Sequence, residues 1–321
     1  MVTMNKKITM ALVALMLTAP ITANASVKKT LSNTSLPAPT IAILDTAIDM
    51  SQPKFQNSVV HEVCLIEIFF DSTPRCPNGL TSMEGPGAAT LAKNKLSVGG
   101  FDHGTLMADQ ALQTNPNVKI VFIRIIGQRE SGVREYTNEA TVYNALQWVI
   151  NNQSKFNIQS VAMAQGSHAL GAAGTDYCPK TPTTVEKVKA LNALNVGVFF
   201  PAGNNSDYKR VDWPSCIPET ISMGATMPTE SIAFYSNYDS KLVDFYARGT
   251  TVLYGLDGKK TNFAGSSASV LVGATSWATI KSIKTTLSYT EMYDLISKTS
   301  KLTSSSRVGS GKLIDLAKAI G

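Results

Sequence analysis

The chain has 321 residues, of which 44% are hydrophobic, and a formal net charge of +6 at pH 7. This hydrophobic fraction is sufficient for a full globular core. The positive charge is dispersed, with no basic run and no stretch in which basic and aromatic residues alternate, so we do not expect nucleic acid as a partner.

The first 25 residues have the pattern of a secretory signal peptide. Lys6 and Lys7 precede an apolar run that extends from Ile8 to about Ala19, and Ala23-Asn24-Ala25 has the small-x-small form of a cleavage site. The apolar run is too short to span a bilayer, and no later stretch is long and apolar enough to do so. We therefore expect an exported protein, secreted or periplasmic, without a membrane span.

Residues 26–39 are interpreted as a short extended lead-in and residues 40–321 as one domain, in which short apolar strands alternate with helices. Strands are expected at 40–44, 118–126, 160–163, 196–200 and 220–223. Helices are expected from His103, from Thr137-Asn138-Glu139, and over 185–194, 266–281 and 313–320. Residues 50–100, rich in Pro and Gly, are expected to be irregular. Since the strands look buried on both faces, the pattern predicts an α/β fold: a mainly parallel central sheet with helices on both faces.

The four cysteines are Cys64, Cys76, Cys178 and Cys216. An even number in an exported chain favours disulfides, of which three pairings are open. We favour Cys64–Cys76 and Cys178–Cys216, because the first two cysteines lie close together in one loop-like stretch. The chain lacks C-x-x-C spacing with nearby histidines, so no metal site is expected.

Two residues at the edges of predicted elements are candidates for catalysis. Asp45 follows the apolar run 41–44 and so lies at the carboxyl end of a buried strand, where open α/β sheets place ligands and catalysts. His103 opens a predicted helix. A turn aspartate and a solvated or capping histidine are the structural alternatives, and His61 and His168 are the weaker candidates for a catalytic base.

Two further candidates lie later in the chain. Ser267 follows Gly265-Ser266 at a helix start, where small neighbours leave its hydroxyl accessible and its own N–H can help to bind an oxyanion. Ser266 is the competing nucleophile, and an N-cap serine is the structural alternative. Asn204 follows a strand and Ala202-Gly203, so its amide could donate to a tetrahedral intermediate; a simple Gly-Asn turn is the alternative.

Taken together, the four segments resemble the subtilisin-like serine protease family, also called subtilases or peptidase family S8. Asp45-Thr46 is similar to the family's Asp-Ser/Thr-Gly, His103-Gly104-Thr105 to its His-Gly-Thr, and Gly265-Ser266-Ser267 to its Gly-Thr-Ser. Ala202-Gly203-Asn204 is similar to its oxyanion motif, and the order Asp, His, Ser also agrees. Ala164-Gln165 departs from the usual substrate-binding strand, which marks a divergent, bacterial-type secreted member.

The resemblance implies a three-layer subtilisin-like domain and a secreted serine endopeptidase. Ser267 would attack the peptide carbonyl, His103 would take its proton, Asp45 would orient the imidazole, and Asn204 would donate to the oxyanion. The residues expected to line the substrate cleft are Ala164, Gly166, Ala202 and Gly203.

The resemblance also bears on partners and cofactors. The expected partners are protein or peptide substrates, and no cofactor is expected; calcium is common in the family, but the sequence has no convincing calcium loop. Between residue 26 and Asp45 there is no room for a folded pro-domain, so the chain folds unaided or a separate inhibitor or chaperone protein assists it. The alternative function is a protease-like binding protein that is catalytically weak or inactive.

Overall fold

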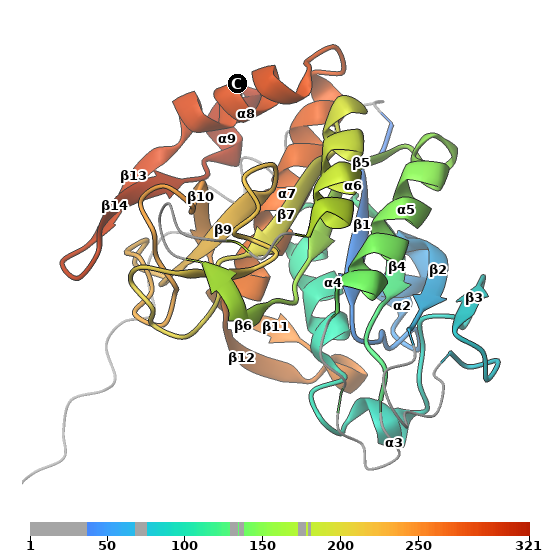
Figure 1. Cartoon of the computed structure of the whole chain (residues 1–321). Helices are drawn as coiled ribbons and strands as arrows, with labels where there is room; N and C mark the ends of the chain where they lie inside the picture. Colours follow the sequence, from blue (N-terminus) through green and yellow to red (C-terminus); the bar gives the residue numbers. More distant parts are fainter. Residues whose placement is uncertain (1–36, 68–75, 129–133, 135–137, 173–177, 179–180) are drawn as a thin grey trace, which may run out of the picture.

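The computed structural model describes residues 37–67, 76–128, 134, 138–172, 178 and 181–321. The predicted signal peptide, residues 1–25, and most of the lead-in 26–39 lie outside these residues. The centre of the fold is a ten-stranded sheet with the order β13-β14-β10-β9-β7-β5-β1-β4-β2-β3 (Figure 1). Its strands are β1 (Thr40–Asp45), β2 (Val59–Leu65), β3 (Ser82–Glu84), β4 (Lys119–Arg124), β5 (Ile158–Met163), β7 (Gly197–Pro201), β9 (Ile221–Thr226), β10 (Phe245–Arg248), β13 (Lys301–Ser305) and β14 (Gly309–Leu313).

From β2 through β14 the neighbouring strands of this sheet are parallel, and β3 and β13 pair antiparallel at its two edges. Two small sheets lie outside it: β6 (Ser167–Ala172) with β8 (Val211–Trp213), and β11 (Thr250–Tyr254) with β12 (Lys260–Ala264). The helices are α2 (Pro53–Ser58), α3 (Lys93–Leu96), α4 (His103–Thr114), α5 (Glu139–Phe156), α6 (Pro182–Ala193), α7 (Ser266–Ile283), α8 (Tyr289–Thr299) and α9 (Leu316–Ile320).

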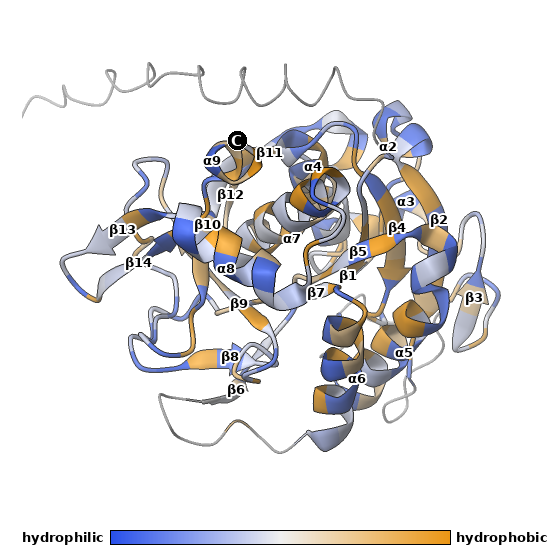
Figure 2. Cartoon of the chain, turned by 90° about the horizontal axis from the view of Figure 1, so that it is seen from above, coloured by the Kyte–Doolittle hydropathy of each residue, from blue (hydrophilic) through white to orange (hydrophobic). Residues whose placement is uncertain are grey.

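Strand β1 shows how the sheet separates two apolar layers. Ile41 and Ile43 pack in one cluster with residues of α4 and α7, whereas Ala42 and Leu44 pack in a second cluster with α5 and α6. Side chains alternate between the faces of a strand, so a strand that is apolar at every position must be covered on both sides. Figure 2 shows α5 and α6 on one side of the sheet and α4 and α7 on the other. The predicted three-layer α/β arrangement is confirmed.

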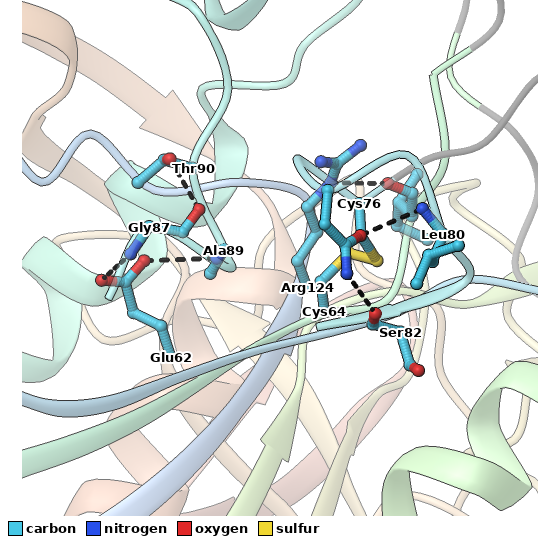
Figure 3. Close-up of a disulfide and its surroundings, with 11 residues drawn as sticks. Glu62, Cys64, Cys76, Leu80, Ser82, Gly87, Ala89, Thr90 and Arg124 are labelled. Carbon is cyan, nitrogen blue, oxygen red and sulfur yellow. Dashed lines mark hydrogen bonds between the residues drawn. A yellow bond between two sulfur atoms is a disulfide. The ribbon is translucent and has the colours of Figure 1, made fainter. Parts of the chain in front are cut away.

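The expectation that residues 50–100 are irregular was wrong in one important part. Val59–Leu65 forms β2, which pairs in parallel with β4 and antiparallel with β3. Glu62 interrupts the apolar pattern of this strand, although it is buried; its carboxylate accepts hydrogen bonds from the N–H groups of Gly87 and Ala89 (Figure 3). These two hydrogen bonds compensate the cost of burying the Glu62 carboxylate. A charged residue at this position had spoken against a buried strand.

Both predicted disulfides are present, Cys64–Cys76 and Cys178–Cys216. The first joins β2 to the turn that begins at Cys76 (Figure 3). The side chain of Asn78 stabilises this turn by accepting from Leu80 N–H and donating to the carbonyl of Ser82. The disulfide therefore ties an irregular segment to an outer strand of the sheet. Within the described residues, none of the helices is long and apolar enough to cross a lipid bilayer.

The C-terminal prediction needs a correction. The helix expected over 313–320 begins only at Leu316, because Leu313 is the last residue of β14 and pairs with Tyr246 of β10. The hairpin of β13 and β14 completes this edge of the sheet. Helix α8 precedes the hairpin and begins at a capping box in which Ser288 and Glu291 exchange hydrogen bonds.

Candidate active site

Asp45 lies at the carboxyl end of β1 and is fully buried. Its Oδ1 accepts the N–H of Thr46 at 2.6 Å, and its two oxygens lie 2.8 and 3.0 Å from Nδ1 of His103. A carboxylate on Nδ1 fixes the imidazole ring and leaves Nε2 as the nitrogen that can accept a proton. The structure thus brings the first two sequence candidates into direct contact.

The start of α4 holds His103 against the end of β1. Thr46 Oγ1 donates to the carbonyl of Phe101 and accepts the N–H of Gly104, both at 2.9 Å. One side chain thus binds the backbone on both sides of His103. A Cβ on Gly104 would lie 2.6 Å from the carbonyl oxygen of Ala47, a distance that no side chain tolerates. The glycine after His103 is therefore required by the close approach of α4 to the segment that follows β1.

Ser267 is the second residue of α7, and its Oγ donates to the carbonyl of Ala164 at 3.0 Å. Both side chains lie in the described part of the chain, and no hydrogen bond joins Ser267 Oγ to His103. In unliganded active sites such catalytic bonds are often long or poorly aligned. Ser267 and Asp45 nevertheless contact one short segment, because Gln165, the residue after Ala164, donates to Asp45 at 3.1 Å.

Ser266 has a different place. It is completely buried, and its Oγ donates to Oδ1 of Asn204 at 2.9 Å and accepts the N–H of Gly203 at 3.3 Å. A hydroxyl held in this way supports the loop of Asn204 and cannot reach a substrate. Of the two neighbouring serines, Ser266 is bound to the Asn204 loop, whereas Ser267 Oγ donates to the carbonyl of Ala164.

The amide of Asn204 has a defined orientation. Its Oδ1 accepts the backbone N–H of Ser266 at 2.7 Å, and because a backbone N–H can only donate, the other amide atom must be the NH2 group. That NH2 would lie 3.5 Å from a Cβ on Gly265, beside the first residues of α7. The exposed amide therefore presents its donor at the helix start from which the Ser267 side chain projects.

The residues expected to line a substrate cleft differ in exposure. Gly166 is exposed, whereas Ala164, Ala202 and Gly203 are buried. The Ala202 carbonyl accepts from the N–H of Asp212 and from the side chain of Asn237. Ala202 therefore stabilises the segment that leads to Asn204 and does not itself line a cleft. Gly203 has a φ of +114°, a backbone conformation that favours glycine and turns the chain into Asn204.

A profile of the subtilase family matches residues 37–311. The chain belongs to the subtilase family. Among solved structures, proteases from Pseudoalteromonas arctica superpose with a TM-score of 0.69 at 18% identity, covering 91% of this chain and 92% of theirs. The epidermin leader peptide processing serine protease of Staphylococcus aureus superposes with a TM-score of 0.65 at 17% identity, covering 89% of this chain and 76% of its own. These likenesses confirm the subtilisin-like fold.

Curated relatives include cuticle-degrading serine proteases. The protein of Arthrobotrys oligospora is 25% identical over 219 residues, and that of Orbilia oligospora is 25% identical over 221 residues. Each alignment covers 67% of this subtilase but only 44% and 42% of the relative. This chain therefore matches less than half the length of these two relatives.

The two other histidines of this subtilase do not approach Asp45. His61 lies on β2, stacks on Trp148 and Phe156, and contacts Glu84 at 3.3 Å. His168 lies on β6, with its Nδ1 3.0 Å from Oδ1 of Asp212. All three histidines are described, each lies beside a carboxylate, and His103 is the one beside Asp45. In the part of the chain that the structure describes, no group of three or more His, Cys, Asp or Glu side chains could hold a metal ion.

Gln165 and Thr46 are site residues whose contacts sequence reasoning missed. Gln165 is 5% exposed, and its Nε2 lies 3.1 Å from Asp45 Oδ1 and 3.2 Å from His103 Nδ1. A polar residue two positions after the end of the buried strand β5 was the available signal. The partner of Gln165, 120 residues earlier in the chain, could not be named without the fold.

Proposed function

We propose that this subtilase is an exported serine endopeptidase that hydrolyses peptide bonds with Ser267 as nucleophile, His103 as general base and Asp45 as its orienting carboxylate. The observation that carries the proposal is the contact of 2.8 Å between Asp45 Oδ1 and His103 Nδ1, which directs the basic nitrogen of the imidazole away from the buried carboxylate. A histidine held in this tautomer beside a serine is the arrangement that activates a hydroxyl nucleophile.

In the proposed reaction, Ser267 Oγ turns from the Ala164 carbonyl toward His103 Nε2 and attacks the peptide carbonyl carbon. His103 takes the hydroxyl proton and delivers it to the leaving amine, which departs as the C–N bond breaks. Water then repeats the sequence on the acyl-enzyme, with His103 again as base, and releases the acid and the free serine. Asp45 keeps its negative charge throughout and stabilises the imidazolium.

The tetrahedral intermediate of each step carries a negative oxygen. The NH2 group of Asn204 and the N–H of Ser267 at the start of α7 are the proposed donors to that oxygen. The hydrogen bond from Ser266 N–H to Asn204 Oδ1, 2.7 Å long, supports this role because it orients the amide before substrate arrives.

Asn204→Ala is expected to lower kcat for a peptide substrate by about 10²- to 10³-fold, the usual cost of one oxyanion donor, with a small change in KM. Steady-state kinetics on a chromogenic peptide measures both constants. Asn205→Ala is the matched control, since the hydrogen bond from Asn205 to Asn237 uses its backbone N–H, and it is expected to stay near the wild-type kcat. An Asn204→Ala enzyme with wild-type kcat would remove Asn204 from the mechanism.

The proposed substrates are proteins and peptides, bound in extended form beside residues 163–166 in the manner of an added strand. Export is proposed from the signal-peptide pattern of residues 1–25 and is supported by the two disulfides, which form in oxidising compartments. The alternative of a catalytically weak or inactive binding protein is not favoured, because the chain has all four candidate catalytic side chains and its curated relatives are serine proteases.

The direct test is proteolysis by the exported protein. It is expected to degrade denatured casein, and the reaction is expected to stop after treatment with phenylmethylsulfonyl fluoride, which sulfonylates activated serine hydroxyls with loss of fluoride. A folded preparation, as judged by a cooperative thermal transition, that leaves casein intact would refute the endopeptidase proposal and restore the binding-protein alternative.

A further inference from the structure

Asp212 packs against two glycines of the proposed site, Gly203 and Gly166. A Cβ on Gly203, the residue before Asn204, would lie 2.5 Å from Cγ of Asp212. A Cβ on Gly166, which follows Gln165, would lie 3.3 Å from Cβ of Asp212 and 3.5 Å from its Oδ2. The carboxylate therefore packs directly on both backbone segments that form the proposed cleft walls.

Asp212 has neighbours that leave it in an anionic cluster. His168 Nδ1 lies 3.0 Å from Asp212 Oδ1, and the amide of Asn237 donates to the same oxygen at 3.0 Å. On its other side, His168 Nε2 lies 3.7 Å from Oδ2 of Asp207. The exposed fraction of the side chains rises outward, from 11% for Asp212 to 31% for Asp207 and 34% for His168. The cluster thus begins at the glycines and opens toward solvent.

The cluster has an excess of negative charge. It contains two carboxylates and one imidazole, and among the described residues neither Asp207 nor Asp212 forms an ion pair with a lysine or arginine. Burial raises the pKa of Asp212 above its usual range, the nearby charge of Asp207 adds to this, and the hydrogen bond and charge of His168 oppose it. A largely buried carboxylate that no fixed cation compensates is costly to the fold, so it points to a function.

From this geometry we propose that Asp212 makes the enzyme select lysine or arginine at the substrate residue immediately before the cut bond. The inference rests on the proposed endopeptidase function and names its substrate class. The substrate residue before the cut bond carries the carbonyl that Asn204 and Ser267 would bind. Its side chain would therefore begin beside the backbone of Gly166 and Gly203. Both glycines lack side chains, and the groups packed against Gly203 are the Asp212 carboxylate and the Asn237 amide that donates to it, so Asp212 is the charged group at the base.

Lysine and arginine fit this position because each has a long aliphatic stem and a terminal cation. The stem would pass the two glycines, and the cation would pair with Asp212 and the outer Asp207. A leucine or phenylalanine in the same place would remove water from the Asp212 carboxylate without replacing its hydrogen bonds. A glutamate would add a third negative charge to the cluster. A site built in this way discriminates strongly, since the wrong side chain leaves a charged group unpaired.

The test is a series of fluorogenic peptides that differ only at the residue before the cut bond, with arginine, lysine, phenylalanine, leucine or glutamate. For the wild-type enzyme, kcat/KM is expected to be at least about tenfold higher with arginine or lysine than with phenylalanine. Asp212→Asn is expected to lower the arginine-to-phenylalanine ratio of kcat/KM by about 10- to 100-fold, and Asp207→Asn by a smaller factor. Asp294→Asn removes the same charge from α8 and is the matched control, expected to keep the wild-type ratio.

The outcomes separate the two proposals. An enzyme that cleaves the series but prefers phenylalanine or leucine would overturn the role of Asp212 and leave the endopeptidase proposal intact. An enzyme that cleaves none of the peptides and no casein would overturn the endopeptidase proposal itself. If Asp212→Asn fails to fold, the wild-type series and Asp207→Asn still decide, since neither depends on that variant.

Discussion

Replacing Ser267 by alanine is expected to lower kcat for peptide hydrolysis by about 10⁶-fold, the order found when the nucleophile of subtilisin is removed. The reason is that the neighbouring hydroxyl, that of Ser266, is buried and bound to Asn204, so it cannot form the acyl-enzyme in place of Ser267. Hydrolysis of a chromogenic peptide, followed over hours at high enzyme concentration, measures the residual rate. The fold is expected to persist, because Ser267→Ala loses only the Oγ bond to the Ala164 carbonyl.

Ser266→Ala is the matched control for this prediction. It removes one of two hydrogen bonds to Asn204 Oδ1 and keeps the other, from the backbone N–H of residue 266. We expect a partial loss of kcat, no more than about the 10²- to 10³-fold cost of losing the oxyanion donor itself. If Ser266→Ala abolished hydrolysis and Ser267→Ala left it near the wild-type rate, the assignment of the nucleophile would be reversed.

Replacing Asp45 by asparagine is expected to lower kcat by about 10⁴-fold, with little change in KM. Asp45 accepts from Thr46 N–H, from the Gln165 amide and from His103. An asparagine can offer only one oxygen to these donors, and its NH2 group beside His103 would favour the tautomer with the proton on Nε2. That tautomer cannot take the proton of Ser267, so the loss is expected in kcat.

Asp239→Asn provides the control for this change of charge. Asp239 is also buried, and its Oδ1 accepts the N–H groups of Lys241 and Leu242, which an asparagine oxygen can still do. Its kcat is expected to stay close to the wild-type value. Equal losses of kcat for Asp45→Asn and Asp239→Asn would show that loss of a buried carboxylate acts through stability, and would contradict a specific role for Asp45.

The elements that hold the candidate site were predictable because their sequences have one dominant feature each. The strand before Asp45 is apolar at each position from Ile41 to Leu44, and the helix after Gly265 is built mainly of small and apolar residues. The first pattern predicts a buried strand, and the second predicts a buried helix. The order of the candidates along the chain then follows from the order of these elements.

Edge elements were missed for the opposite reason, since their sequences are mixed. Strand β2 contains His61 and Glu62 within a β-forming run, and its buried glutamate is explained only by the N–H groups of Gly87 and Ala89, more than 20 residues later. The hairpin of β13 and β14 is polar and rich in Ser and Gly, as a loop would be. For α8, the Ser288–Glu291 capping box was visible in the sequence and could have marked its start.

The contacts that define the site chemistry could not be predicted from the sequence. Gln165 reaches Asp45 across 120 residues, and His168 reaches Asp212 across 44. Each of these residues is a common polar type in an unremarkable local sequence, and only the folding of the chain brings the partners together. The sequence therefore indicated which residues could act, whereas the fold was needed to identify what surrounds them.

Labelling with a fluorophosphonate probe tests the central claim most directly, because the probe reacts only with a serine that is activated by a neighbouring base. The wild-type protein is expected to take one equivalent of probe on Ser267, located by fragmentation of the labelled peptide. Ser266→Ala is expected to be labelled as well, and Ser267→Ala is expected to remain unlabelled. A folded wild-type protein that takes no probe, or a label on Ser266, would contradict the account.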